Sequence, residues 1–247
     1  MQKETKAYDV GSLRRSEWIG GLLYWPMFLV GSTLLAYFLV RWFWPTSNEA
    51  LKSARVNLTY GVLNLVLVLP IFRRYLTDQL RRLIDSGWSL FGHLFLGLLA
   101  YFGLTYAAAW AQQILTPLFG VTYANANQSA VESYTRTVPG LAIVQLCLLA
   151  PLTEEVLTRG LFFVKLHERS RFWAYAVSML VFSLAHCWAA IPLQPIGVTL
   201  LNVLIYLPAG WVLAWVYERS GSLWTSVFLH ALINAIALLA QILLHRA

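Results

Sequence analysis

Residues 172–217 read FWAYAVSMLVFSLAHCWAAIPLQPIGVTLLNVLIYLPAGWVLAWVY and contain no Asp, Glu, Lys or Arg. A helix needs about 20 apolar residues to cross a bilayer, so this stretch is long enough for two crossings. Pro192 and Pro195 stand near its middle, where the chain is expected to turn. The stretch therefore predicts a hairpin of two membrane-spanning helices.

The whole chain has a similar character. Of its 247 residues, 59% are hydrophobic and only 12% are charged, and the mean hydropathy is +0.62. A soluble domain carries about 25% charged residues, so the composition excludes a soluble globular enzyme and a disordered chain. We expect an all-α polytopic membrane protein in which residues 1–247 form a single membrane domain. Seven spans are predicted, or eight if one segment is broken. Besides the hairpin, these spans lie between Glu17 and Arg41, between Arg55 and Arg73, near 88–117, from Arg136 to Lys165, and from Ser222 to Leu244.

Lys and Arg gather in alternate connections, which indicates the orientation of the chain. Segments 73–87 and 165–171 are rich in them, whereas 118–137 contains only Arg136, and loop 41–56 is an exception. The N-terminus is therefore expected in the cytoplasm and the C-terminus on the far side. In a membrane protein the net charge of +7 indicates contact with anionic lipid, and no nucleic-acid partner is expected.

Segment 73–87 differs from the spans because it is both charged and periodic. Its apolar residues Leu76, Leu80, Leu83 and Ile84 fall on one helical face, and its charges pair at i,i+4 on the rest. This pattern predicts an interfacial amphipathic helix on the cytoplasmic side. A solvated connector is the alternative.

Three charged residues lie inside a predicted span: Glu154, Glu155 and Arg159. A central charge costs about 2.5–3.5 kcal/mol in membrane insertion, so such residues indicate a functional site. Glu155 and Arg159 are four residues apart and can pair on one helix face. Glu154 points about 100° away and is left free to act as a general base. The alternative is a structural ion pair between helices.

Three neutral polar residues lie at a similar depth in two other spans. His186 is in the middle of one span, and His230 and Asn234 are one turn apart in another. Each lies within about 10–14 residues of a predicted cytoplasmic helix end, which corresponds to similar depths at 1.5 Å per residue. A single histidine in a membrane more often serves packing. The shared depth favours one site.

At these positions the sequence resembles the CAAX protease and bacteriocin-processing (CPBP) family, which includes the type II CAAX prenyl endopeptidases. The segment Tyr217–Trp224 is similar to the family's lead-in to its last motif. The resemblance covers residues 138–240. It implies that 138–246 are the catalytic core helices and that 1–137 are family-variable N-terminal helices. Three motifs in order carry it: Glu154-Glu155-x-x-x-Arg159, Phe182-x-x-x-His186 and His230-x-x-x-Asn234.

The resemblance implies an intramembrane endopeptidase whose active site lies within the bilayer, towards the cytoplasmic side. Glu154 would be the general base that activates water, with His186 oriented to help. His230 and Asn234 would stabilise the oxyanion. Peptide hydrolysis requires an activated water and donors directed at the developing oxyanion, and these residue types supply both.

The resemblance also leaves a supporting role for Glu155 and Arg159, which would hold the helix of the first Glu in place. No cofactor is expected. A zinc-dependent version remains open, because Glu154, His186 and His230 form a two-His, one-carboxylate set. The H-E-x-x-H spacing of common metalloproteases is absent from the sequence, so a metal-free glutamate mechanism is favoured.

Other functions remain as alternatives. A non-enzymatic membrane scaffold or regulator could keep the same fold, and a small-solute or proton transporter could use the same buried carboxylates. The complete Glu–His–His–Asn set favours the protease, and no repeated halves with broken helices point to a transporter. The expected partners are the lipid bilayer and a membrane-associated substrate: a prenylated CAAX tail, a bacteriocin-like precursor or a signalling-peptide precursor.

Overall fold

The computed structural model describes residues 9–244, which form helices joined by short connections and contain no strand. Seven of the helical segments are long and apolar enough to cross a membrane. The predicted all-α polytopic membrane fold is confirmed. The seven segments are Arg15–Phe43, Glu49–Ser86, Ser89–Phe119, Pro139–His167, Arg171–Leu193, Ile196–Ser220 and Leu223–Leu243.

Three of these segments are subdivided by changes in helical winding. The first contains α1 (Arg15–Pro26), the π-helix η1 (Met27–Gly31) and α2 (Ser32–Phe43). The fourth contains α6 (Pro139–Val144), η2 (Gln145–Leu149), α7 (Ala150–Glu155), η3 (Val156–Phe163) and α8 (Val164–His167), of which η2 and η3 are π-helices. The fifth contains α9 (Arg171–Cys187) and the 3₁₀-helix η4 (Trp188–Leu193). The remaining helices are α3 (Glu49–Ser86), α4 (Ser89–Phe119), α5 (Ala126–Thr137), α10 (Ile196–Ser220) and α11 (Leu223–Leu244).

The helices begin and end at residues that satisfy exposed backbone groups. The side chain of Asn48 accepts a hydrogen bond from the backbone of Leu51 at the start of α3, and Ser170 caps α9 in the same way. Gly120 and Gly221 end α4 and α10 with positive φ angles, a conformation that glycine adopts without steric cost. The observed ends lie within a few residues of the predicted ones except in α3, which begins before Arg55 and extends beyond Arg73 to Ser86.

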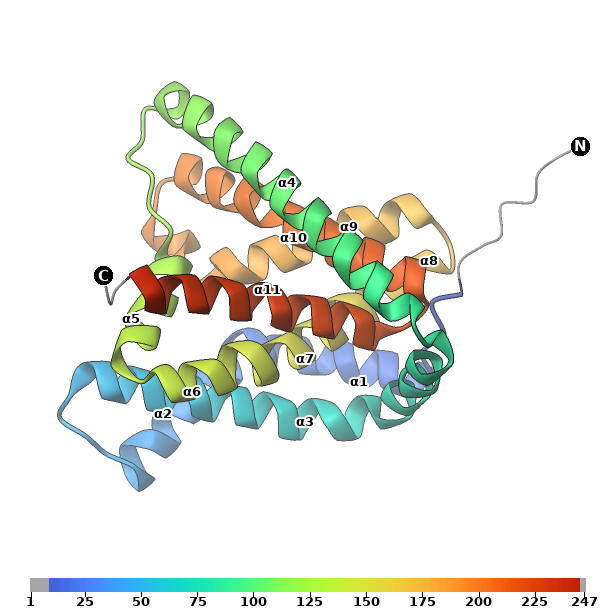
Figure 1. The fold of residues 1–247 in the computed structure, drawn as a ribbon. Helices are drawn as coiled ribbons and strands as arrows, with labels where there is room; N and C mark the ends of the chain where they lie inside the picture. The colour runs from blue at the N-terminus through green and yellow to red at the C-terminus, as the bar shows by residue number, and fades with distance from the viewer. Residues whose placement is uncertain (1–8, 245–247) are drawn as a thin grey trace, which may run out of the picture.

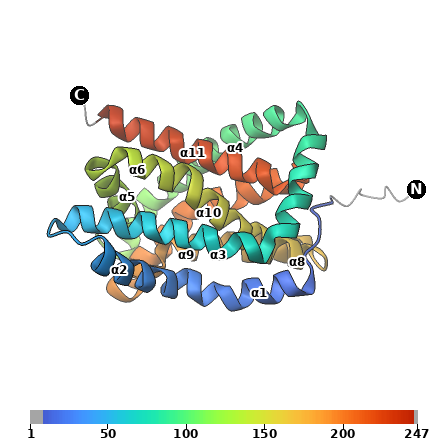
Figure 2. The same ribbon diagram turned by 90° about the horizontal axis from the view of Figure 1, so that it is seen from below.

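The long helices lie side by side, with α4 slanting across the bundle (Figure 1). The start of α1, the end of α3 and α8 gather at one end of the bundle, and α5 and the last turns of α11 lie at the other (Figures 1 and 2). Gly210 allows α10 to approach α9 closely, because a Cβ atom there would lie 3.0 Å from the backbone of Met179. The bundle therefore brings α7, α9 and α11 together around its interior.

Segment 73–87 corrects one prediction: it is the final part of α3 rather than a separate helix. Figure 2 shows α3 bending so that its last turns run across the end of the bundle. Tyr75, Leu76 and Gln79 are buried there, whereas Leu80 and Ile84 are exposed. Pro70 lies inside α3 just before this segment, but the helix does not end there and continues until Gly87.

Connection 118–137 also differs from the expected polar loop, because it contains α5. The side chain of Asn125 caps this helix by accepting from the backbone of Gln128 at 2.9 Å. The face of α5 that is turned towards the bundle carries Asn127, Val131 and Tyr134. The polar composition of α5 concealed it, because its apolar stripe is narrow. This short helix becomes important at the site.

Candidate active site

Glu154 lies near the end of α7, a short α-helix that separates the π-helices η2 and η3. π-helical turns are rare in proteins, and those that do occur are often found at functional sites. A third π-helix, η1, supplies Phe28 and Leu29 to the same cavity as Glu154. Irregular winding in two spans therefore surrounds this carboxylate.

Pro151 explains the π-helix η2 and the contact that Asn234 makes beside it. The backbone N–H of Ala150 donates to the carbonyl of Gln145, five residues back, and Pro151 has no N–H. The carbonyl of Leu146 is thus left without a donor from either residue. The side-chain Nδ2 of Asn234 donates to it at 2.7 Å. This bond fixes α11 against the fourth span beside the cavity.

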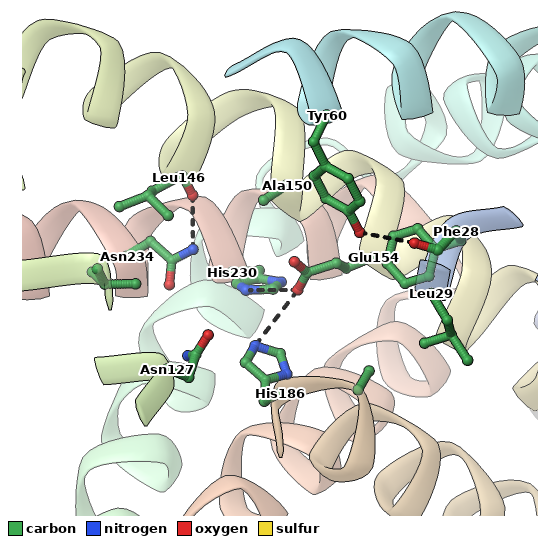
Figure 3. Close-up of a pocket in the computed structure, with 12 residues that line it drawn as sticks. Phe28, Leu29, Tyr60, Asn127, Leu146, Ala150, Glu154, His186, His230 and Asn234 are labelled. Atoms are coloured by element: carbon green, nitrogen blue, oxygen red, sulfur yellow. Dashed lines mark hydrogen bonds and ion pairs between the residues drawn. The ribbon is translucent and has the colours of Figure 1, made fainter. Parts of the chain in front are cut away.

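Glu154 faces two imidazoles within ion-pair distance, as the dashed lines in Figure 3 mark, but it forms a hydrogen bond with neither. Its Oε2 lies 3.7 Å from Nε2 of His186 and 3.9 Å from Nε2 of His230. Both separations exceed hydrogen-bond distance. Oε2 is buried and has no hydrogen-bond partner within residues 9–244. A buried carboxylate oxygen without a hydrogen-bond donor is costly, so a donor that enters the cavity would be favoured at this atom.

Glu155 has the opposite environment, since both of its oxygens are occupied. Oε1 lies 3.1 Å from Nη1 of Arg159 and 3.0 Å from Nδ1 of His230, and Oε2 accepts from the hydroxyl of Ser226 at 2.6 Å. Glu155 and Arg159 are both fully buried. The expected pair between them is present. Arg159 also donates to the carbonyl of Gly210 at 2.9 Å, which links three spans.

The second histidine is oriented by backbone. Nδ1 of His186 lies 2.9 Å from the carbonyl of Phe182, so this nitrogen is the donor and Nε2 faces Glu154. The ring of His186 also lies against Tyr206, with 4.7 Å between ring centroids. In both histidines, an acceptor at Nδ1 turns Nε2 towards the same carboxylate.

The cavity at these residues has a volume of about 230 Å³. It brings together Glu154, His186, His230 and Asn234, the four residues expected to act directly. Its lining is Phe28, Leu29, Tyr60, Asn127, Val131, Leu146, Ala150, Glu154, Ala185, His186, His230 and Asn234.

The sequence analysis missed several of these neighbours. Phe28, Tyr60 and Asn127 come from the first 137 residues, which the resemblance does not cover. Ser226 lies between the lead-in and His230, and its contact with Glu155 is not visible in the sequence. Only the cap signal of Asn125 could have indicated that Asn127 lies in the first turn of a helix.

The geometry also bears on metal binding and on depth. Among the residues described, no group of three or more His, Cys, Asp or Glu is arranged to hold a metal ion.

The cavity is lined by α5, at the end of the bundle opposite the arginine-rich end of α3 (Figure 1). The cytoplasmic N-terminus and the cytoplasmic position of the site both stay predictions.

Comparison with known proteins follows the same motifs. Residues 136–236 match a family model described as type II CAAX prenyl endopeptidase Rce1-like. The resemblance predicted from the three motifs is confirmed. The matched region contains Glu154, His186, His230 and Asn234. No solved structure shows significant similarity to the chain.

Two curated relatives agree with this match. One, from Bacillus subtilis (strain 168), is named "Putative membrane peptidase YdiL" and is 25% identical over 72% of this chain and 68% of its own length. The other, "UPF0177 protein YaiF" from Lactococcus lactis subsp. lactis (strain IL1403), is 32% identical over 48% of this chain and half of its own length. Together with the seven apolar helices, these comparisons support an integral multi-pass membrane protease that acts on membrane-associated proteins or peptides.

Proposed function

We propose that this protein is an intramembrane endopeptidase that hydrolyses a peptide bond with a water molecule activated by Glu154. The observation that carries the proposal is the position of Oε2 of Glu154. This atom is buried and unpaired in a cavity, between Nε2 of His186 and Nε2 of His230. A structural ion pair would be in direct contact, as Glu155 and Arg159 are at 3.1 Å.

The separations suit a shared water. Two atoms 3.7 Å apart can both lie about 2.8 Å from one water oxygen placed to the side of the line joining them. Glu154 accepts a proton from that water, and the lone pair on Nε2 of His186 accepts a hydrogen bond from it. The water oxygen is then directed at a substrate carbonyl in the cavity.

Attack by water turns the carbonyl oxygen of the substrate into an oxyanion, which hydrogen-bond donors must stabilise. Nδ1 of His230 donates to Glu155, so Nε2 becomes a donor only when the ring is doubly protonated, and the carboxylate of Glu155 stabilises that cation. The second amide hydrogen of Asn234 is a further donor, because the first is held by Leu146. These two groups stabilise the tetrahedral oxyanion.

The proton balance then closes within the site. Water loses a proton to Glu154 as its oxygen bonds to the carbonyl carbon. The protonated Glu154 returns this proton to the amide nitrogen as the carbon–nitrogen bond breaks. The products are a carboxyl terminus and an amine, and Glu154 returns to its ionised form.

A zinc-dependent version of this protease is the alternative for the same residues. The acceptors at Nδ1 of both histidines resemble the outer-shell contacts that orient metal-bound imidazoles. Glu154, His186 and His230 would hold the ion, and zinc would supply a water of lowered pKa. We favour the metal-free form, with no cofactor, because the H-E-x-x-H spacing of common metalloproteases is absent from the sequence.

We propose that the substrates are prenylated, bacteriocin-like or signalling-peptide precursors at the membrane.

A non-enzymatic scaffold of the same fold makes a different prediction, because its function would not require Glu154. The decisive test is cleavage of a quenched fluorogenic peptide library by the purified protein and by its Glu154→Gln variant. Loss of cleavage in a folded variant supports the protease, and equal cleavage contradicts it.

A further inference from the structure

The first turn of α5 is attached to α10 by a hydrogen-bond chain whose direction can be derived. Oδ1 of Asn125 accepts from the backbone of Gln128 at 2.9 Å as the helix cap. Oδ1 also lies 3.2 Å from the hydroxyl of Tyr206, which must therefore donate to it. The hydroxyl of Tyr206 has only one hydrogen, so it accepts from Asn127, whose Nδ2 lies 3.0 Å away.

This chain leaves one acceptor free. With Nδ2 bonded to Tyr206, the amide oxygen of Asn127 has no hydrogen-bond partner in the part of the chain that the structure describes. Asn127 lines the cavity, and Figure 3 shows its oxygen turned to the side where His230 and Asn234 lie. The wall around it is mixed, with apolar members such as Val131, Leu146 and Ala185 beside the polar residues of the site.

A peptide in such a cavity must find partners for its backbone N–H groups, since an unpaired N–H away from water is costly. We propose that the amide oxygen of Asn127 accepts a hydrogen bond from a backbone N–H of the bound peptide and so sets its register against Glu154. This inference rests on the proposed function. It adds a substrate-binding residue from outside the matched region 136–236.

Tyr206 is the positioning residue for Asn127. Its hydroxyl orients the amide, while its ring lies against His186. The two contributions can be separated, because Tyr206→Phe removes the hydroxyl and keeps the ring.

The test measures binding apart from cleavage. The probe is the member of a randomised fluorogenic peptide library that binds the Glu154→Gln protein most tightly, followed by fluorescence anisotropy in detergent. Adding Asn127→Ala is expected to weaken this binding about fivefold to tenfold, as the loss of one hydrogen bond predicts. Gln128→Ala is the matched control, because Gln128 is exposed on α5 and bonds to Glu132. It should leave binding unchanged.

The Tyr206→Phe variant gives a second measurement with a smaller structural change. In the protein with Glu154 intact, Tyr206→Phe should raise KM about threefold and leave kcat within twofold, because the ring against His186 remains. A purely structural role would lower the melting temperature and the active fraction without moving KM.

The outcomes separate the two proposals. Unchanged affinity in Asn127→Ala overturns this inference, and if that variant does not fold, an unchanged KM and affinity in Tyr206→Phe overturns it. Failure of every library peptide to bind also overturns it. Weakened binding in Asn127→Ala, with no cleavage by the parent protein, would support Asn127 and contradict the proposed function instead.

Discussion

Nδ1 of His230 lies 3.0 Å from Oε1 of Glu155. This contact joins the first and third motifs and gives the two adjacent glutamates separate tasks. Glu155 orients the imidazole, and the imidazole presents Nε2 to the unpaired oxygen of Glu154. The order of the motifs along the chain thus corresponds to one connected arrangement in space.

Arg159→Ala should destabilise the protein and reduce its activity together. The variant leaves Glu155 fully buried without its cation, a change that typically costs about 3–5 kcal/mol. Thermal unfolding in detergent and cleavage of the fluorogenic library are the two measurements. An inactive variant with an unchanged melting temperature would instead give Arg159 a direct role in the chemistry.

His230→Ala should lower kcat by about 10²–10³-fold if the ring stabilises the oxyanion. The variant also leaves Oε1 of Glu155 with only Arg159 as a partner, so the melting temperature should fall moderately. His93→Ala is the matched control, because this histidine lies outside the cavity lining. A kcat within threefold of the parent value would remove His230 from the oxyanion site.

Pro151→Ala tests whether the irregular winding serves the site. Alanine supplies the missing N–H and allows regular α-helical bonding around Leu146 and Cys147. We expect the melting temperature to stay the same or rise while kcat falls at least about tenfold, because Asn234 loses its acceptor and Glu154 is rotated. Full activity in this variant would show that the π-helix η2 is dispensable.

Chelation distinguishes the two versions of the mechanism. For the metal-free site, exhaustive chelation followed by gel filtration should leave turnover unchanged, with much less than one zinc per chain by elemental analysis. For a zinc site, chelation should abolish turnover and added Zn²⁺ should restore it. Restoration by zinc would contradict the metal-free mechanism and leave the protease assignment in place.

The spans were predictable because a charge inside a bilayer is expensive and charges therefore mark helix ends. The same rule identified Glu154, Glu155 and Arg159 as exceptions, and the i,i+4 spacing predicted the observed pair. Segment 73–87 is helical as predicted, but its amphipathic pattern does not reveal whether the preceding helix stops. It continues as part of α3.

The remaining features depend on contacts between distant segments. The acceptor that Pro151 leaves free at Leu146 becomes informative only when Asn234 is seen to fill it. Asn127 sits in a polar stretch with no apolar periodicity strong enough to indicate a helix, and its direction depends on Tyr206. Such bonds span about 80 residues of sequence and have no local signature.

Cleavage by the Glu154→Gln variant is the most direct test of the account. Glutamine keeps the size and one carbonyl oxygen of Glu154 but cannot take a proton from water. The purified parent protein should cleave the fluorogenic library, and the variant should show no turnover above background while unfolding at the parent temperature. Turnover within about tenfold of the parent value would contradict the general-base role of Glu154.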